Sequence, residues 1–211
     1  MLKPTFKIEK KLVKKGYRFV IGIDEAGRGP LAGPVVASAV ALKTWDSMAQ
    51  HPLLELIRDS KTLSEKQREK LFDFIHEHFH VGVGICSHET VDRINVLEAT
   101  YLAMKKALTD ITGKINRDQN CIILVDGNRG IPNLSLEQRA IVGGDGSVRS
   151  ISAASIVAKV TRDRIMKKMH ENYPEYGFLS NKGYGTKVHM EAIKKYGLCD
   201  IHRKSFKPCS N

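Results

Sequence analysis

The stretch VIGIDEAGRGPLAGP, residues 20–34, decides how the first part of this chain folds. Residues 18–24 form a short run that would be apolar on both faces of a strand, which is typical of a central strand covered on both sides. A glycine-rich turn follows, and residues 34–42 (PVVASAVAL) form a second apolar run. Because so little chain separates the two runs, we expect them to be antiparallel neighbours in one sheet.

Strands and helices alternate along the rest of the chain. We predict strands at residues 81–86, 121–126 and 139–142, and helices at residues 3–15, 64–78, 91–108, 151–169 and 187–195, with a loop containing a helical piece at 44–58. Thr62 and Glu65 fit a capping box before the second of these helices. This order predicts an α/β fold with a mixed sheet and helices on its faces. We interpret residues 1–211 as one compact unit in which roughly 161–211 form a helical C-terminal appendage.

Composition sets expectations about partners and location. The formal net charge of +11 favours polyanionic partners, although a basic protein can also simply be soluble. Four cysteines without CxxC spacing argue against a zinc ribbon or a thioredoxin-type motif, and we expect free thiols. No apolar run approaches the ~18 residues of a membrane span, and the basic start has no apolar signal segment. We therefore expect a cytoplasmic protein with no membrane partner.

Acidic residues follow apolar strands at several places. Asp24 and Glu25 end the first predicted strand, Asp126 ends the fourth, and Asp145 lies between the fifth strand and a long helix. Acids at the ends of adjacent strands converge, because neighbouring strands lie about 5 Å apart. Clustered carboxylates repel unless protons or cations bind among them, and Mg²⁺ or Mn²⁺ prefer such oxygen ligands. The set predicts a metal site that acts on phosphates, although one such acid alone is more often a turn or cap residue.

Two other motifs invite different interpretations. Residues 27–32 fit a loose dinucleotide-binding pattern, but Pro30 and a strand-like run follow where that motif needs a helix. His76 and His80 match HExxH and would lie one helical turn apart, as in zinc peptidases. That match falls at the end of a helix, where the helix dipole also favours histidine, and the longer metzincin pattern fails. We favour the dipole explanation and keep a zinc peptidase as the rival function.

Several blocks of the sequence, taken in order, resemble the ribonuclease HII family. The resemblance spans roughly residues 20–206, and the first block is specific by itself. The blocks are GIDEAGRGPLAGP (22–34), DSKTL (59–63), INVLEAT (94–100), VDG (125–127), GD (144–145), SAASIVAKVTRD (152–163), KGYGT (182–186) and HRKSF (202–206).

The resemblance implies an RNase H-like sheet of five strands, with divalent ions held by Asp24, Glu25, Asp126 and Asp145. Two Mg²⁺ or Mn²⁺ ions would support an in-line displacement, in which one activates water and the other stabilises the leaving 3′-oxygen. The resemblance also implies that the protein is an endonuclease that acts on RNA–DNA hybrids. Single ribonucleotides in duplex DNA would be cut on their 5′ side, leaving 3′-hydroxyl and 5′-phosphate ends. Ribonucleotide excision repair and primer removal are the roles expected, for a monomer.

Substrate-binding roles follow from the same resemblance. The backbone of Gly27, Arg28 and Gly29 would contact the ribose 2′-hydroxyl, the group that distinguishes RNA from DNA. Tyr184 would pack on the sugar next to the RNA–DNA junction. A non-catalytic nucleic-acid binder is the alternative that the positive charge alone suggests.

Lys61 and Asn95 match family positions that hold the nucleic-acid backbone. A solvated lysine and a helix-capping asparagine are the alternative interpretations. One departure is visible, because many relatives carry Lys-Gly-Asp where this chain has Gly143-Gly144-Asp145. A positive charge beside the fourth acid is therefore missing from that position. Some relatives carry a clamp-binding peptide at the C-terminus, and residues 207–211 do not resemble one convincingly.

Overall fold

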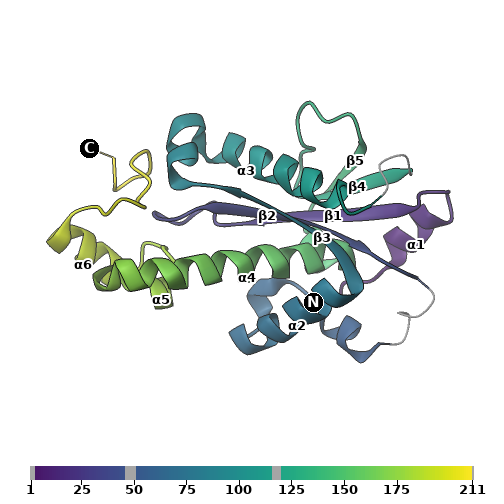
Figure 1. The fold of residues 1–211 in the computed structure, drawn as a ribbon, viewed down its shortest axis with the longest axis horizontal. Helices are drawn as coiled ribbons and strands as arrows, with labels where there is room; N and C mark the ends of the chain where they lie inside the picture. The colour runs from purple at the N-terminus through teal and green to yellow at the C-terminus, as the bar shows by residue number, and fades with distance from the viewer. Residues whose placement is uncertain (1–2, 46–50, 116–119, 211) are drawn as a thin grey trace.

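A five-stranded mixed sheet forms the centre of the protein (Figure 1). The computed structural model describes residues 3–45, 51–115 and 120–210. The sheet has the order β3-β2-β1-β4-β5, and the predicted mixed α/β architecture is confirmed. Its strands are β1 (Phe19–Ala26), β2 (Val35–Leu42), β3 (Phe79–Cys86), β4 (Cys121–Asp126) and β5 (Glu137–Ile141).

The register of β1 with its two neighbours determines where the acids lie. β1 is antiparallel to β2, as predicted, and parallel to β4. Ile23 is paired with Val125, so Asp24 and Asp126 follow at the same edge of the sheet. Every residue of β2 is buried, as expected for a strand covered on both faces.

Helices cover both faces of this sheet (Figure 1). α3 (His88–Thr112) packs on one face, against β3 and β2, while α4 (Arg149–Asn172) packs on the other, against β1 and β2. α2 (Glu65–His78) lies beside α4. The approach of α3 is close because β3 carries two glycines: a Cβ added at Gly84 would lie 2.0 Å from the Ala103 carbonyl oxygen.

The cap of α2 differs from the prediction. Ser64 accepts a hydrogen bond from the Gln67 N–H at 3.3 Å, and the Ser64 N–H donates to Gln67 Oε1 at 2.9 Å. This reciprocal pair is the capping box, so the assignment to Thr62 and Glu65 is wrong. Thr62 instead ends a short 3-10 turn, η2 (Ser60–Thr62), which delays the start of the helix.

The N-terminal segment is fastened to the start of α4. α1 (Lys7–Val13) is shorter than the predicted helix at 3–15. The Thr5 N–H donates to the Ser147 carbonyl at 3.1 Å, and Glu9 Oε1 accepts from the Ser150 N–H at 2.9 Å. Glu9 thereby caps a helix that has no side-chain cap of its own at Val148. Another 3-10 turn, η1 (Pro52–Leu56), lies within the predicted 44–58 loop, of which residues 46–50 are outside the described part.

The C-terminal region is helical and extends beyond the sheet (Figure 1). It contains η4 (Pro174–Tyr176), α5 (Phe178–Asn181) and α6 (Lys187–Tyr196). The predicted start of an appendage near residue 161 falls inside α4, which continues from the sheet into this region without interruption. None of the described helices is long and apolar enough to cross a membrane.

Candidate active site

Three carboxylates from distant parts of the chain meet at one edge of the sheet. Asp24 lies in β1, Asp126 ends β4, and Asp145 lies in the 3-10 turn η3 (Gly144–Gly146) that precedes α4. One oxygen of each lies within 4.8 Å of the others. Asp24 is 6% exposed, so its charge has little solvent to stabilise it.

Crowding and burial make the charged state of this cluster unfavourable. Burial raises the pKa of Asp24 well above its ordinary value, and the charges of Glu25 and Asp126 raise it further. Burial also raises the pKa of Asp126, with a further contribution from Asp145. A cation among the three oxygens would relieve both effects. Oxygen donors at this spacing suit a hard divalent ion.

Lys61 is the cation nearest to Asp145 in the described structure. Its Nζ lies 3.1 Å from Asp145 Oδ2. Burial lowers the pKa of Lys61, but the hydrogen bond to Asp145 and the charges of Asp145 and Asp59 outweigh burial, so the pKa lies above its ordinary value. A positive charge thus reaches Asp145 from another segment of the chain.

Glu25 lies beside the cluster without being part of the close group of three. Its Oε1 lies 3.4 Å from the Arg28 guanidinium. Burial raises the pKa of Glu25, while Arg28 acts in the opposite direction. Successive strand residues face opposite sides of a sheet, which explains why Glu25 diverges from Asp24. It lines the same pocket as Asp24 and Asp126.

The glycine-rich turn and Tyr184 complete this pocket, which has a volume of about 230 Å³. A Cβ added at Gly29 would lie 3.8 Å from the Tyr184 ring, so the turn and the tyrosine are neighbours. Tyr184 is 45% exposed and presents an apolar ring to solvent. The lining residues are Asp24, Glu25, Ala26, Gly27, Arg28, Gly29, Ser60, Lys61, Asp126, Ser155, Lys159, Arg162 and Tyr184.

Three α4 residues in this pocket, Ser155, Lys159 and Arg162, belong to a sequence block of the family but have no individual role that the sequence predicts. Ser155, Lys159 and Arg162 recur at helical spacing in an otherwise apolar stretch, a signal that could have identified them. Ser155 Oγ lies 2.8 Å from Ser60 Oγ. Burial lowers the pKa of Lys159, whose Nζ donates to Asp163 at 2.7 Å.

Asn95 lies outside the residues that line this pocket. It interrupts α3 with a φ of 64°, and its side-chain oxygen accepts from the N–H groups of Leu97 at 2.9 Å and Glu98 at 3.1 Å. Asn95 therefore caps the second part of α3, which agrees with the alternative interpretation. Its exposed position leaves a contact with nucleic acid as a prediction.

The two histidines of the HExxH match do not share a helix. α2 ends at His78, so His80 lies in β3, and the expected spacing of one helical turn is wrong. The His76 ring packs on Phe72 at 4.4 Å, and the His80 ring packs edge-on to Phe19 at 5.7 Å. Among the residues that the structure describes, only the three aspartates form a group placed to hold a metal.

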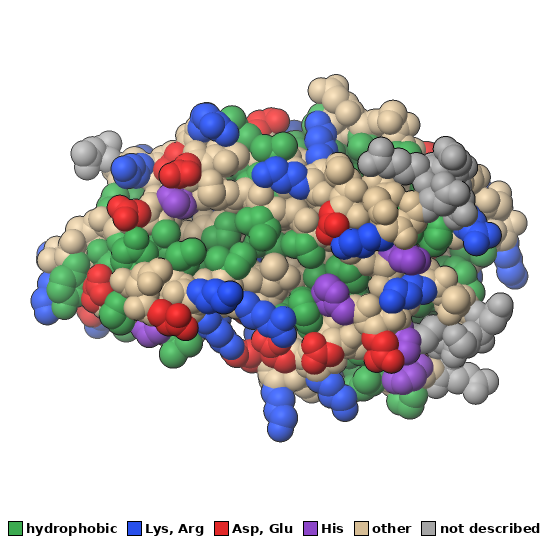
Figure 2. Space-filling view, viewed as in Figure 1, with side chains coloured by type: hydrophobic (Ala, Val, Ile, Leu, Met, Phe, Trp, Pro, Cys, Tyr) green, Lys and Arg blue, Asp and Glu red, His purple; other side chains and the backbone are tan. Residues whose placement is uncertain are grey.

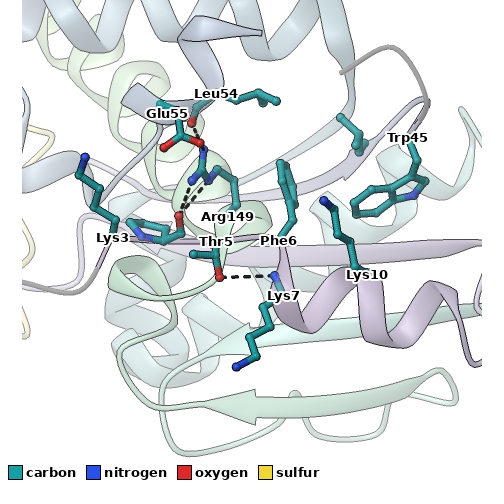
Figure 3. Close-up of a pocket in the computed structure, with 11 residues that line it drawn as sticks. Lys3, Thr5, Phe6, Lys7, Lys10, Trp45, Leu54, Glu55 and Arg149 are labelled. Carbon is teal, nitrogen blue, oxygen red and sulfur yellow. Dashed lines mark hydrogen bonds and ion pairs between the residues drawn. The ribbon is translucent and has the colours of Figure 1, made fainter. Parts of the chain in front are cut away.

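A second cavity, of about 570 Å³, lies near the N-terminal segment (Figure 3). Figure 3 shows Phe6 between Arg149 and Trp45, and the Arg149 guanidinium carbon lies 5.5 Å from the centre of the Phe6 ring. That guanidinium donates to the carbonyls of Pro4 and Leu54, so it holds neighbouring segments together. Among the described residues that line the cavity, Glu55 is the only carboxylate, so these residues do not provide the donor set of a metal site.

Basic side chains are not gathered into one continuous patch on the face seen in Figure 2. Lysine and arginine side chains alternate there with acidic ones. The net charge of +11 therefore says little about where a polyanion binds on that face. The pocket with its carboxylates carries more information than the overall charge.

Comparison with known proteins finds relatives that match this chain over most of its length. The sequence model of the family "Ribonuclease HII" matches residues 21–209. The chain is 50% identical over 202 residues to a ribonuclease HII of Caldicellulosiruptor bescii, covering 95% of this chain and 92% of that one. It is 45% identical to a ribonuclease HII of Endomicrobium trichonymphae, covering 100% and 96%. A solved ribonuclease HII from Archaeoglobus fulgidus, in complex with PCNA, superposes with a TM-score of 0.71 at 26% identity, covering 92% and 97%.

Proposed function

The chain belongs to the ribonuclease HII family of hydrolytic ribonucleases, and we propose that it cuts the RNA strand of RNA–DNA hybrids and cuts 5′ to single ribonucleotides in duplex DNA. The products would carry 3′-hydroxyl and 5′-phosphate ends. One observation carries this proposal: three carboxylates form a close group, and two of them, Asp24 and Asp126, line one pocket with a glycine-rich turn and an exposed tyrosine.

The residues present fit divalent metal ions. Asp24, Asp126 and Asp145 provide oxygen ligands within 4.8 Å of one another, and burial leaves the charges of Asp24 and Asp126 poorly solvated. We propose that these three residues hold Mg²⁺ or Mn²⁺, with Glu25 as a further ligand from the same pocket. When bound, the ions would activate a water and stabilise the leaving oxygen.

The protein's own residues would place the substrate. We propose that the backbone of Gly27, Arg28 and Gly29 contacts the ribose 2′-hydroxyl, since the turn lies at the rim of the carboxylate pocket. The Tyr184 ring, beside Gly29, would stack on the next sugar. Lys61 lies at the same rim and would bind a backbone phosphate once a metal takes over its role beside Asp145.

Cleavage of a DNA duplex that carries one ribonucleotide tests the proposal. The protein should cut it on the 5′ side of the ribonucleotide in Mg²⁺ or Mn²⁺ and should not cut it after chelation. Asp126→Asn should abolish cutting, whereas the matched change Asp73→Asn on the exposed face of α2 should have no effect. Binding without metal-dependent cutting would instead support a nucleic-acid-binding protein without catalysis.

The role of Tyr184 has its own test. Tyr184→Ala should reduce cutting at single embedded ribonucleotides more than cutting of long hybrids. A long hybrid offers many equivalent sites, whereas a single ribonucleotide offers only one junction for the ring to recognise. Equal losses on the two substrates would contradict this role.

We further propose that the activity serves ribonucleotide excision repair and primer removal. Both roles need the strand cut that the pocket is proposed to make. Location in the cytoplasm and a monomeric state stay predictions, to be tested by fractionation and by light scattering.

A further inference from the structure

Two buried arginines lie beneath the glycine-rich turn. Arg162 in α4 is 1% exposed, and Arg203, in the segment after α6, is fully buried. Arg162 donates to the carbonyls of Ala32 at 3.0 Å, Pro34 at 3.0 Å and Lys182 at 2.9 Å. Each of its three donor nitrogens therefore has a backbone acceptor.

Arg203 makes the same kind of contact at the other end of the turn. It donates to the carbonyls of Gly27 at 2.6 Å, Arg28 at 2.9 Å and Gly33 at 3.0 Å. A guanidinium is a rigid planar fork, so these acceptors are fixed relative to one another. The turn cannot shift as a unit without breaking several of these bonds.

The contacts of Arg203 determine where the N–H groups of the turn point. In a planar trans peptide the carbonyl and the following N–H point in opposite directions. Because the carbonyls of Gly27 and Arg28 point into the core toward Arg203, the N–H groups of Arg28 and Gly29 point outward. Neither N–H group donates to any residue that the structure describes. Residues 27–29 line the carboxylate pocket, so two unused donors face it.

Arg162 joins this turn to Tyr184. Its guanidinium carbon lies 5.9 Å from the centre of the Tyr184 ring, and its bond to the Lys182 carbonyl holds the same loop. The Leu31 N–H donates to the Gly183 carbonyl at 2.8 Å, which ties the two loops together directly. A Cβ added at Gly27 would lie 2.2 Å from Arg162 Nε, so the turn rests on this side chain.

Neither arginine has a carboxylate partner within salt-bridge distance among the described residues. Burial lowers the pKa of Arg203 to about 9 and that of Arg162 to about 10. Burying unpaired charge is costly, and apolar side chains would fill this space without that cost. The presence of two arginines at this place is explained if the turn requires the fixed geometry of the guanidinium group.

We propose, resting on the function proposed above, that Arg203 is a positioning residue for the choice between RNA and DNA. Through the carbonyls of Gly27 and Arg28 it keeps the following N–H groups aimed at the ribose 2′-oxygen. Arg162 holds the other end of the turn and keeps it in register with Tyr184. Arg203 does not line the pocket, and Arg162, which does, is only 1% exposed.

The test compares binding of two duplexes, identical except for one central ribonucleotide, in the non-cutting Asp126→Asn background. Fluorescence anisotropy in Mg²⁺ gives the ratio of the two affinities. Arg203→Lys keeps the charge but loses the fork, and it should reduce the preference for the ribonucleotide duplex about tenfold, as for one lost hydrogen bond. Affinity for the all-DNA duplex should stay within about twofold.

Arg149→Lys is the matched control. Arg149 is another buried arginine that donates to backbone carbonyls, those of Pro4 and Leu54, away from the turn. This variant should lose stability and retain the ribonucleotide preference. If Arg203→Lys does not fold, Arg162→Lys tests the other end of the turn, with the same loss expected.

The outcomes separate the two proposals. A folded Arg203→Lys variant with undiminished preference overturns the role of Arg203 alone, as does an equal loss in Arg149→Lys. A protein that neither cuts nor prefers the ribonucleotide duplex overturns the proposed function, and the role of Arg203 with it. Thermal unfolding of each variant shows whether a change in preference follows a loss of stability.

Discussion

Replacing Asp126 with asparagine should stabilise the metal-free protein. Two unit charges 4.8 Å apart, the upper limit for these carboxylate oxygens, repel by about 3.5 kcal/mol at an effective dielectric constant of about 20. Asp126 faces two such charges, on Asp24 and Asp145. Since burial already favours the protonated form of Asp24, we expect a smaller gain, of about 1–2 kcal/mol. The asparagine oxygen can still accept the hydrogen bond from the Asp145 N–H.

With a divalent ion present, the unsubstituted protein should instead be more stable than the Asp126→Asn variant. An ion that binds only the folded state stabilises it by about 2.7 kcal/mol at one hundred times its dissociation constant. The unsubstituted protein should gain this stability from Mg²⁺ or Mn²⁺, and Asp126→Asn should gain little, because it has lost a charged ligand. The assay is urea unfolding near pH 8, followed by circular dichroism, with and without the ion.

Asp73→Asn serves as the control, since Asp73 is an exposed carboxylate on α2. It should leave both the metal-free stability and the response to metal unchanged. The reasoning fails if Asp126→Asn is less stable than the unsubstituted protein without metal. It also fails if the variant responds to Mg²⁺ as strongly as the unsubstituted protein does.

Four further substitutions test the fold. Gly84→Ala should destabilise the protein by more than about 3 kcal/mol in urea unfolding, because the added Cβ would lie 2.0 Å from the Ala103 carbonyl oxygen; a loss below about 1 kcal/mol would contradict the close packing. Ser64→Ala should lower the free energy of unfolding by about 1 kcal/mol and Thr62→Ala should lower it by less, since Ser64 caps the helix. A larger loss for Thr62→Ala than for Ser64→Ala would support the cap at Thr62 instead. Burial lowers the pKa of His202 from 6.5 to about 4. The neutral His202 therefore contributes fully to the free energy of unfolding above pH 6.5. This contribution, up to about 3 kcal/mol, is lost as the pH falls toward 4. His202→Gln should therefore flatten the fall in unfolding free energy between about pH 7 and 4.5, and an unchanged slope would refute this.

The sheet could be predicted because its central strands are unusually apolar. Residues 20–24, 34–42 and 121–125 are buried throughout, and such runs have few alternatives to a central strand. Once β1 and β4 are parallel neighbours, Asp24 and Asp126 must meet at one edge. This part of the candidate site follows from the order of strands alone.

Other details depend on contacts that the sequence does not reveal. Thr62–Glu65 and Ser64–Gln67 both have capping-box spacing, and only the turn at Ser60–Thr62 decides between them. The HExxH match fails because Phe79 leaves α2 to pair with Leu42 in the sheet. Sheet pairing therefore overrides the local helical pattern.

The support of the glycine-rich turn was also beyond sequence reasoning. Arg162 bonds to carbonyls about 130 positions earlier, and Arg203 to carbonyls about 175 positions earlier. A buried arginine that binds backbone carbonyls leaves no complementary acid in the sequence to suggest the contact. The family resemblance pointed to the turn and to Tyr184, and the structure supplies what lies beneath them.

The attachment of the N-terminal segment to the start of α4 has a consequence for biosynthesis. Glu9 and Ser150 are 141 positions apart, so α1 has to wait until these residues have been synthesised before it can dock. Closing so long a loop is entropically costly and belongs late in folding. Asp145 lies just before this junction, so we expect a nascent chain to remain unable to gather its three aspartates until translation is well advanced. A partly made enzyme would then be harmless to the nucleic acids around it.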